Sequence, residues 1–267
     1  MDVTLLGTNG WMPRGSRETT CFAVRTDQTL LVFDAGTGFQ RLLDAEHAGL
    51  LEGAGEVQLF LSHYHLDHTC GLAYLSGVLA GRKVALRPPG EELTGVDPYT
   101  AVGELVRRPY NPVDLPEMKQ VRVEPTRKGE NEAAGHTLRV RPQQHSDTSV
   151  SFRLDDELVI ATDTRVDPDA VAFARGAGLW LHESWYWAGD PGLAAVPAEL
   201  RPGYSAHSEA TGVAGLAAEA EVGRLILVHL NPLAGEASYL PMRDAARAVF
   251  ANTDVVEDGT VARTSVV

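Results

Sequence analysis

The sequence predicts an α/β protein in which strands and helices share one layered core. The apolar run 57–61 has the length of a buried strand, and a helical stripe of leucine and valine follows at 72–79. A polar loop separates them, so the order is strand, loop and helix, as in the layers of α/β proteins. The chain has 267 residues, 44% hydrophobic and 22% charged, as in an ordinary globular enzyme. Because we find no linker, we expect a single domain over residues 1–267.

Three short apolar segments at the start of the chain have the pattern of antiparallel strands. They cover residues 3–6, 20–24 and 30–33 and are separated by turn residues. An amphipathic helix is expected from Phe39 onward. Asp34 therefore stands where a strand gives way to a helix.

The segment 87–125 is rich in proline and less regular. Only a short piece at 101–106 has a helix-like pattern. We interpret the segment as a flap-like connection within the same domain, lying over the edge of the functional site.

The second half of the chain alternates strands and helices. A strand at 138–142 leads to His145, and the segments 150–154 and 158–161 form a hairpin. The other expected elements are a helix at 168–175, a strand at 179–182, a helix at 208–220 capped by Ser208, a strand at 225–230, a helix at 244–250 and a hairpin that turns on Asp258 and Gly259.

The charge and the cysteine content limit the partners. A formal net charge of −13 repels phosphate backbones, so a nucleic-acid partner is disfavoured. Cys21 and Cys70 form no disulfide framework, and the chain begins at Met1 without a charged and apolar leader, so we expect a cytoplasmic protein. No apolar run approaches the roughly 18 residues of a membrane helix, so no membrane partner is expected.

Three histidines and an aspartate follow the strand at 57–61 within six residues: His63, His65, Asp67 and His68. Imidazole and carboxylate are the ligands of zinc and of its borderline neighbours. A tetrahedral ion rarely needs more than four protein ligands, so this crowding, with further candidates elsewhere, indicates two ions. The alternative is a solvated histidine-rich loop, or a chelating patch without catalysis.

Three further candidates share one placement. His145, Asp163 and His229 each stand at the carboxyl end of an expected strand, where functional side chains of α/β proteins converge. Taken singly, His145 reads as a surface residue, Asp163 as a turn former and His229 as a core imidazole. Their common placement favours one site.

Taken in order, these motifs resemble the metallo-β-lactamase superfamily along essentially the whole chain. The resemblance is carried by the stretch 62–68 with Gly71-Leu72, by Gln143 to Ser146, by Thr162 to Thr164 and by Val228 to Leu230. The segments 5–10, 17–21 and 31–36 are similar to the branch that holds ribonuclease Z and small phosphodiesterases. The resemblance implies a four-layer αββα sandwich with two mixed β-sheets.

The resemblance also implies how the ligands divide. It assigns one metal ion to His63, His65 and His145, and the other to Asp67, His68 and His229, with Asp163 as the bridge. Zinc is the first expectation, and manganese and iron remain open because nitrogen and oxygen ligands are mixed. Asp67 is expected to be a catalytic residue as well as a ligand. Asp34 matches an early aspartate that steadies the ligand loop, so we expect it to be structural.

A second pair indicates the type of substrate. His182-Glu183-Ser184 and Ser205-Ala206-His207-Ser208 resemble two short motifs of ribonuclease Z in which a glutamate holds a histidine that faces the scissile phosphate. The match is partial, because Ser184 and Trp185 depart from the first motif. Glu183 and His207 are therefore expected to be catalytic, with His207 as donor to the departing oxygen. The alternative is that Glu183 merely ends a strand and His207 precedes a helix.

These residues lead to one functional hypothesis and its rivals. We expect a dinuclear metal-dependent hydrolase that cleaves small or cyclic phosphodiesters with a metal-bridging hydroxide as nucleophile. A thioester or lactone hydrolase and a non-catalytic metal-binding regulatory protein are the alternatives. Processing of transfer RNA at its 3′ end is less favoured, because the interval from His145 to Asp163 holds one hairpin, whereas the resemblance implies a substrate-gripping arm there in ribonuclease Z. The same resemblance implies a homodimer.

Overall fold

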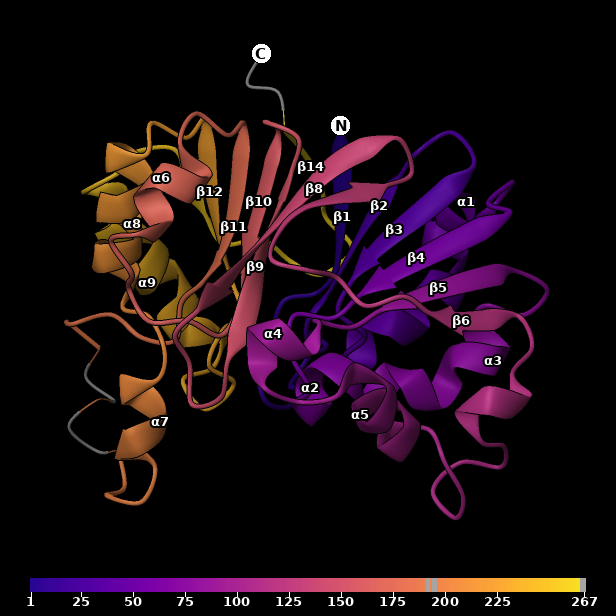
Figure 1. The fold of residues 1–267 in the computed structure, drawn as a ribbon. Helices are drawn as coiled ribbons and strands as arrows, with labels where there is room; N and C mark the ends of the chain where they lie inside the picture. Colours follow the sequence, from indigo (N-terminus) through magenta and orange to yellow (C-terminus); the bar gives the residue numbers. More distant parts are fainter. Residues whose placement is uncertain (191–192, 194–195, 265–267) are drawn as a thin grey trace.

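The protein is built on two seven-stranded sheets packed face to face with helices outside (Figure 1). The computed structural model describes residues 1–190, 193 and 196–264. The first sheet has the order β14-β1-β2-β3-β4-β5-β6 and the second the order β13-β12-β11-β10-β9-β8-β7. Both are mixed, since each combines antiparallel and parallel pairs. The predicted αββα sandwich is confirmed.

The strands of the first sheet are β1 Asp2–Gly7, β2 Cys21–Arg25, β3 Thr29–Phe33, β4 Glu56–Phe60, β5 Lys83–Arg87, β6 Val121–Val123 and β14 Val261–Arg263. Those of the second are β7 Gly129–Ala133, β8 His136–Gln143, β9 Ser149–Leu154, β10 Leu158–Ala161, β11 Leu179–Glu183, β12 Arg224–Val228 and β13 Thr253–Asp254.

The described α-helices are α1 Ala48–Leu51, α2 Leu66–Thr69, α3 Leu75–Val78, α4 Glu91–Thr94, α5 Pro98–Leu105, α6 Ala170–Ala174, α7 Arg201–Ser205, α8 Ala210–Glu219 and α9 Glu236–Arg247. Short 3₁₀ helices cover Thr37–Leu43, Ala45–His47, Cys70–Tyr74 and Leu115–Glu117. Within the described parts of the chain, no helix is long and apolar enough to cross a bilayer.

Strands are apolar on both faces because one face packs in the core between the sheets and the other packs against the outer helices. In β3, Leu31 and Phe33 point inward, whereas Leu30 and Val32 face the outer helices. The Phe33 ring lies 5.3 Å from that of Phe152 across the sheets. Each such buried side chain contributes about 1.5–3 kcal/mol relative to an exposed one. Both sheets contribute side chains to this inner core. This sharing supports our proposal that residues 1–267 form a single domain.

The outer layers complete the sandwich (Figure 1). Helices α6, α8 and α9 cover the second sheet, and α1, α3 and α5 pack on the first. The predicted antiparallel hairpins β1–β2–β3 and β9–β10 are confirmed. The layers leave the carboxyl ends of β4, β10, β11 and β12 at one end of the molecule.

Several predicted elements differ in detail. The helix expected after Phe39 is a 3₁₀ helix, and the stripe at 72–79 is divided between a 3₁₀ turn and α3. Helix α8 is capped by Glu209, whose carboxylate accepts from the Gly212 N–H, whereas the buried Ser208 hydroxyl donates to the Thr164 carbonyl instead. Helix α9 starts eight residues before the predicted 244–250.

The segment 87–125 is more regular than its prolines suggested. Helix α5 begins at Pro98, with the Asp97 carboxylate accepting from the Thr100 N–H, because proline is well suited to the first turn of a helix. Strand β6 joins the first sheet beside β5. Strands β5, β6 and β7 were all missed: β6 and β7 are short edge strands with charged residues, and β5, between β4 and β6, is a short strand with a charged residue at each end.

One other prediction was wrong. The tail was expected to be a hairpin on Asp258 and Gly259, but β13 pairs with β12 in the second sheet and β14 pairs with β1 in the first. The tail therefore crosses from one sheet to the other, because each has a free edge at that point.

Asp258 anchors this crossing. Its side chain is 2% exposed and accepts hydrogen bonds from the Thr8 hydroxyl at 2.7 Å and the Glu18 N–H at 2.6 Å. Burial raises the pKa of its carboxyl from 3.8 to about 6, although these bonds act in the opposite direction.

We predict that this carboxyl makes the protein less stable as pH rises from about 4 to about 6. In that window the folded state keeps a proton that the unfolded state has released, so the free energy of unfolding falls by at most about 3 kcal/mol and then levels off. Asp258→Asn should lack this component. Urea denaturation of both proteins between pH 4 and 7 measures it, with the exposed Asp27→Asn as control. A difference between Asp258→Asn and the native protein that does not change with pH contradicts the prediction.

Candidate dinuclear metal centre

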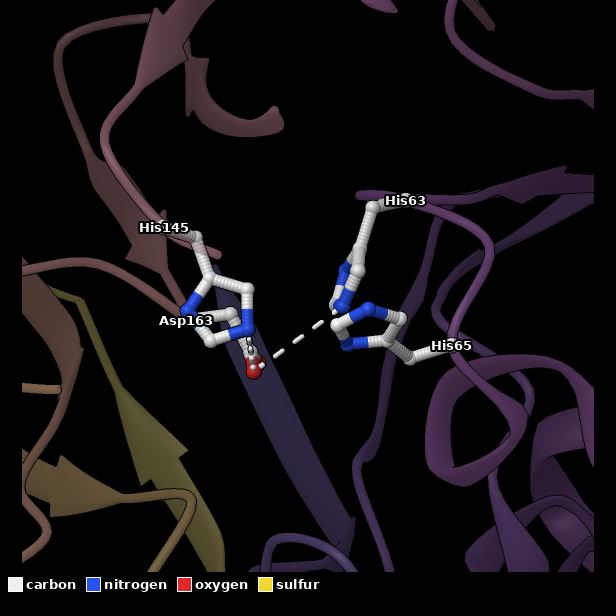
Figure 2. Close-up of side chains that lie close together, drawn as sticks. All are labelled: His63, His65, His145 and Asp163. Atoms are coloured by element: carbon white, nitrogen blue, oxygen red, sulfur yellow. Dashed lines mark ion pairs between the residues drawn. The ribbon is translucent and has the colours of Figure 1, made fainter. Parts of the chain in front are cut away.

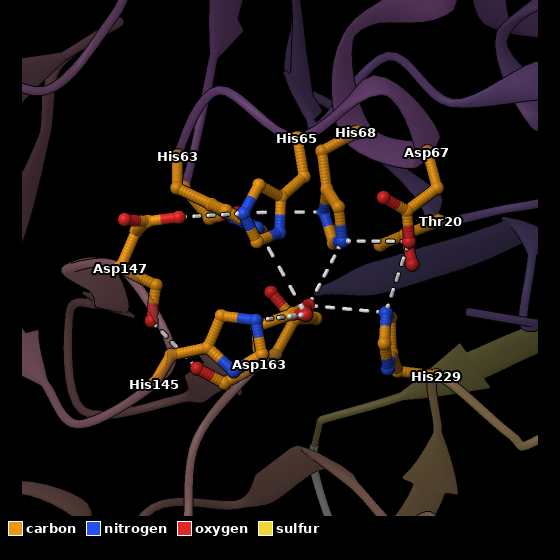
Figure 3. A network of polar contacts seen from close by, with 12 residues as sticks. Thr20, His63, His65, Asp67, His68, His145, Asp147, Asp163 and His229 are labelled. Atoms are coloured by element: carbon orange, nitrogen blue, oxygen red, sulfur yellow. Dashed lines mark hydrogen bonds and ion pairs between the residues drawn. The ribbon is translucent and has the colours of Figure 1, made fainter. Parts of the chain in front are cut away.

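All seven predicted ligands meet at one edge of the sandwich (Figure 3). His63 and His65 lie in the loop that follows β4, and Asp67 and His68 lie in the first turn of α2. The other three follow the ends of β8, β10 and β12. Their side chains come from segments up to 166 positions apart, so the fold alone brings them together.

The backbone is strained at this edge. Asp34, Asp163 and His229 all have positive φ angles, of 60°, 53° and 48°. Non-glycine residues in this region cost about 1–3 kcal/mol each and occur where function requires a fixed direction. Here the left-handed residue turns the chain immediately after a strand and directs its side chain into the site.

A first ligand group consists of His63, His65, His145 and Asp163 (Figure 2). One ligand atom from each lies within 4.8 Å of the others. The Oδ1 atom of Asp163 is 3.2 Å from Nε2 of His145 and 3.9 Å from Nε2 of His63.

A second ligand group consists of Asp67, His68 and His229, again within 4.8 Å. The other oxygen of Asp163, Oδ2, is 2.8 Å from Nε2 of His68 and 3.1 Å from Nε2 of His229. The two oxygens of one carboxylate thus face the two groups, and we propose that Asp163 bridges two ions.

The residues present fit a pair of divalent ions. Among the described residues, Nε2 of His63 is buried without a hydrogen-bond partner. Nε2 of His68 and Oδ2 of Asp163 are also buried without a hydrogen bond, although they lie 2.8 Å apart as an ion pair. Buried polar atoms rarely remain unpaired, so ligand atoms that converge in this way indicate metal ions. Imidazole nitrogen and carboxylate oxygen suit zinc, manganese and iron alike.

The shifted pKa values in the two ligand groups also agree with metal binding. Burial opposes the charged form of His229, but the carboxylates of Asp163, Asp67 and Glu183 outweigh it and raise its pKa to about 10. Burial alone would raise the pKa of Asp163, but neighbouring histidines hold this pKa well below its usual range. Without metal, protons on His68 and His229, whose pKa values are both raised by neighbouring carboxylates, balance the negative charge. Metal binding displaces such protons.

Asp34 supports the centre from behind. Its carboxylate accepts from the N–H and the hydroxyl of Ser62 at 2.7 and 2.8 Å, and its Oδ2 lies 2.8 Å from Nδ1 of His68. Nε2 of His68 is thereby left to face the ligand group. The predicted link to the ligand loop is present, and the contact with the His68 ring adds a direct influence on a ligand.

Other supporting residues were missed from the sequence. Asp147 Oδ2 lies 3.0 Å from Nε2 of His65, and the carbonyl of Ala206 lies 3.1 Å from Nδ1 of His145. Carboxylate and carbonyl partners of this kind orient ligating imidazoles. The carboxylate of Asp147, two residues after His145, was the available signal. A main-chain carbonyl offers none.

The N-terminal loop closes the second group. The Trp11 N–H donates to Asp67 at 2.7 Å, and a Cβ at Gly10 would lie 2.3 Å from the His229 ring. Only glycine therefore fits beneath that ring. This close approach follows from the tertiary structure and was not predicted.

The structure brings Glu183 and His207 together beside the two groups. Nδ1 of His207 is 2.6 Å from the buried Oε2 of Glu183. The other carboxylate oxygen accepts from the N–H groups of Thr164 and Ser208 at 2.8 and 3.1 Å. Burial opposes ionisation of Glu183, but His207 and His229 outweigh it and lower its pKa to about 2. Glu183 is thus a fixed carboxylate that accepts from His207.

The nearby aromatic residues have separate uses. Trp185 stacks on the His207 ring with centroids 4.3 Å apart, and Tyr204 lines the same cavity. Trp187 packs against the helices outside the second sheet instead. Trp185 and Tyr204 therefore line the site.

We predict that Asp34→Asn lowers metal affinity about 10- to 100-fold, because the asparagine keeps the left-handed backbone but loses the charged partner of His68. Competition with a chromophoric chelator measures this affinity, with Asp27→Asn as the matched control. Unchanged affinity in a folded Asp34→Asn protein would show that Asp34 is not an orienting residue.

Comparison with known proteins agrees with this geometry. A family model described as a beta-lactamase superfamily domain matches residues 29–230. Ribonuclease Z of Prochlorococcus marinus (strain MIT 9303) is 26% identical over 328 residues, covering 97% of this chain and 96% of its own. The metallo-β-lactamase fold protein YhfI from Bacillus subtilis has a TM-score of 0.75 at 18% identity over 98% of both chains. The short form of human tRNase Z has a TM-score of 0.67 at 16% identity over 100% of both. The chain belongs to the metallo-β-lactamase superfamily, in its ribonuclease Z-like branch.

Proposed function

We propose that this metallo-β-lactamase-fold hydrolase cleaves phosphodiesters, and that its substrates are small or cyclic. The observation that carries the proposal is the 2.6 Å contact between Glu183 and His207 beside two ligand groups that share Asp163. Metal ligands alone suit several hydrolytic reactions. A buried carboxylate–imidazole pair beside them adds a proton donor for a poor leaving group.

The chemistry divides between the ions and the chain. Two divalent ions, zinc by first expectation, would be held by His63, His65 and His145 and by Asp67, His68 and His229, with Asp163 between them. When bound, they supply a nucleophilic hydroxide near neutral pH and neutralise the charge of the phosphoryl oxygens. We also propose that Asp67, a carboxylate at this centre, is a catalytic residue as well as a ligand.

His207 acts on the leaving group. Its Nδ1 is bonded to Glu183, so Nε2 is the ring atom that can donate to the departing oxygen. Trp185 stacks on one face of the ring and restricts its rotation. Glu183 is itself held by the N–H groups of Thr164 and Ser208, so the donor has a fixed direction.

Small substrates are favoured because the interval between His145 and Asp163 is short. The interval between His145 and Asp163 contains only β9, β10 and their connections, with no arm. The alignment with ribonuclease Z is longer than this chain, 328 residues against 267, so that relative contains segments with no counterpart here. The net charge of −13 also disfavours RNA.

Processing of transfer RNA is nevertheless the second candidate function. It is favoured by the similarity to ribonuclease Z over 97% of the chain. The prediction that a nucleic-acid partner is disfavoured therefore remains to be tested. The predicted homodimer is likewise a proposal, which sedimentation equilibrium can test.

We predict that His207→Ala reduces kcat/KM for an alkyl phosphodiester about 100-fold and leaves hydrolysis of a thioester nearly unchanged, because a thiolate needs no proton donor to depart. Steady-state kinetics of the zinc-loaded protein on both substrates measure this. His136→Ala is the control, since that histidine is bonded to Asp155 away from the site.

An equal loss on both substrates would contradict the role of His207. A transfer-RNA precursor is the third substrate in the comparison. If it is cleaved more efficiently than every small diester, the second candidate function replaces the first. If zinc-loaded protein hydrolyses none of the three, the protein is a non-catalytic metal-binding one.

A further inference from the structure

Two pockets meet at the metal centre and differ in their chemistry. The first has a volume of about 780 Å³ and the second of about 410 Å³. Both are lined by His65, His145 and Ser146, so they are two arms of one cleft. A phosphodiester also has two arms, one on each side of its phosphorus atom.

The position of His207 distinguishes the two arms. The second pocket is lined by His207 and by two residues of the second ligand group, Asp67 and His229. The first pocket is lined by His63 and by residues of the segment 87–125 and not by His207. An alcohol that takes a proton from His207 must therefore depart through the second pocket, and the first pocket holds the arm that keeps the phosphate.

The second pocket suits an uncharged alcohol. Its walls include Trp11, Leu200, Tyr204 and Leu233. No arginine or lysine is among the described residues that line it, and apart from the residues of the two ligand groups its one carboxylate is that of Glu199. A negatively charged leaving group would find no guanidinium or ammonium group to pair with there.

The first pocket differs by a single arginine. Arg165 is the one arginine or lysine among the described residues that line either pocket. It is exposed, and its guanidinium makes no hydrogen bond or ion pair with a described residue. The acidic residues of this pocket already have partners: Glu104 pairs with Arg107 at 2.7 Å, and Asp147 contacts His65 at 3.0 Å.

Hydrogen bonds to residues around the metal centre fix the backbone at Arg165. Its N–H donates to the carbonyl of Gln144 at 3.0 Å, and the preceding residue, Thr164, donates to Glu183 at 2.8 Å. Arg165 thus lies two positions after Asp163, on a loop fixed to both the His145 segment and Glu183. A guanidinium in this position is available for an anionic group next to the scissile phosphate.

We propose that the substrate is an asymmetric phosphodiester whose retained arm carries a second anionic group, a carboxylate or phosphate, that pairs with Arg165 in the first pocket. The neutral alcohol in the second pocket leaves. Hydroxide formed from water adds to phosphorus, the bond from phosphorus to the alcohol oxygen breaks, and that oxygen takes its proton from His207. The proton that the water released restores His207, so the net reaction consumes one water molecule. The products are the neutral alcohol and a phosphomonoester with the anionic tail. This inference rests on the proposed phosphodiesterase function.

Three series of p-nitrophenyl alkyl phosphates test it, with tails that end in a carboxylate, a methyl group or an ammonium group, each at several lengths. The p-nitrophenyl group occupies the neutral leaving position. We expect zinc-loaded protein to prefer the best carboxylate tail over the methyl tail about tenfold in kcat/KM, as for a charge-assisted hydrogen bond, and to disfavour the ammonium tail. Calorimetric binding of the corresponding phosphomonoesters should give the same order without turnover.

The variants separate this role from a general effect of charge. Arg165→Gln should reduce the carboxylate preference to about one and leave hydrolysis of the methyl-tailed ester unchanged. Arg165→Lys should retain part of the preference, because a point charge replaces the guanidinium fork. Arg263→Gln removes the same charge from the exposed edge strand β14 and should change nothing.

The outcomes distinguish the inference from the function. Equal hydrolysis of all tails by the native protein, or a preference that persists in Arg165→Gln, overturns the role of Arg165 and leaves the phosphodiesterase intact. Equal loss on all tails in Arg165→Gln would assign the arginine to the scissile phosphate and also overturn the inference. If no ester is hydrolysed, the proposed function fails as well.

Discussion

The site depends on the carboxylate of Asp163. One oxygen faces His63 and His145, and the other faces His68 and His229, at distances of 2.8–3.9 Å. The negative charge of this buried carboxylate is balanced only by protons on the surrounding imidazoles or by metal ions. The positive φ at Asp163 is the local cost of aiming this side chain between the two groups. The supporting contacts of Asp34 and Asp147 hold histidines in the direction that this arrangement requires.

Much of the fold and the placement of the candidate ligands could be predicted, because local patterns determine them. The strand at 57–61 and the ligand loop after it are local in sequence, and so is the placement of Asp163 and His229 after strands. The apolar segment 30–33 of β3 has apolar residues on both faces, as expected of a strand buried between layers. The pairing of ligands into two groups was implied by resemblance, and the structure places the residues compatibly with it.

The remainder depends on contacts between distant segments. Nothing near Gly10 indicates that it lies under His229, and the tail was mistaken for a hairpin because its partners β1 and β12 are far away in the chain. Ser208 has the local pattern of a helix cap, but its hydroxyl bonds to Thr164 and Glu209 takes the cap. The charged edge strands β6 and β7 lack the apolar pattern that marks buried strands.

We propose that two ions sharing Asp163 act together with His207 on a phosphodiester. Titration of metal-free protein with zinc, following bound metal and hydrolysis of an alkyl phosphodiester in the same samples, tests this cooperation. We expect activity to appear as the second equivalent binds, and Asp163→Ala to retain weakened binding of single ions without activity. Full activity at one equivalent, or two bound equivalents without hydrolysis of any phosphodiester, would contradict it.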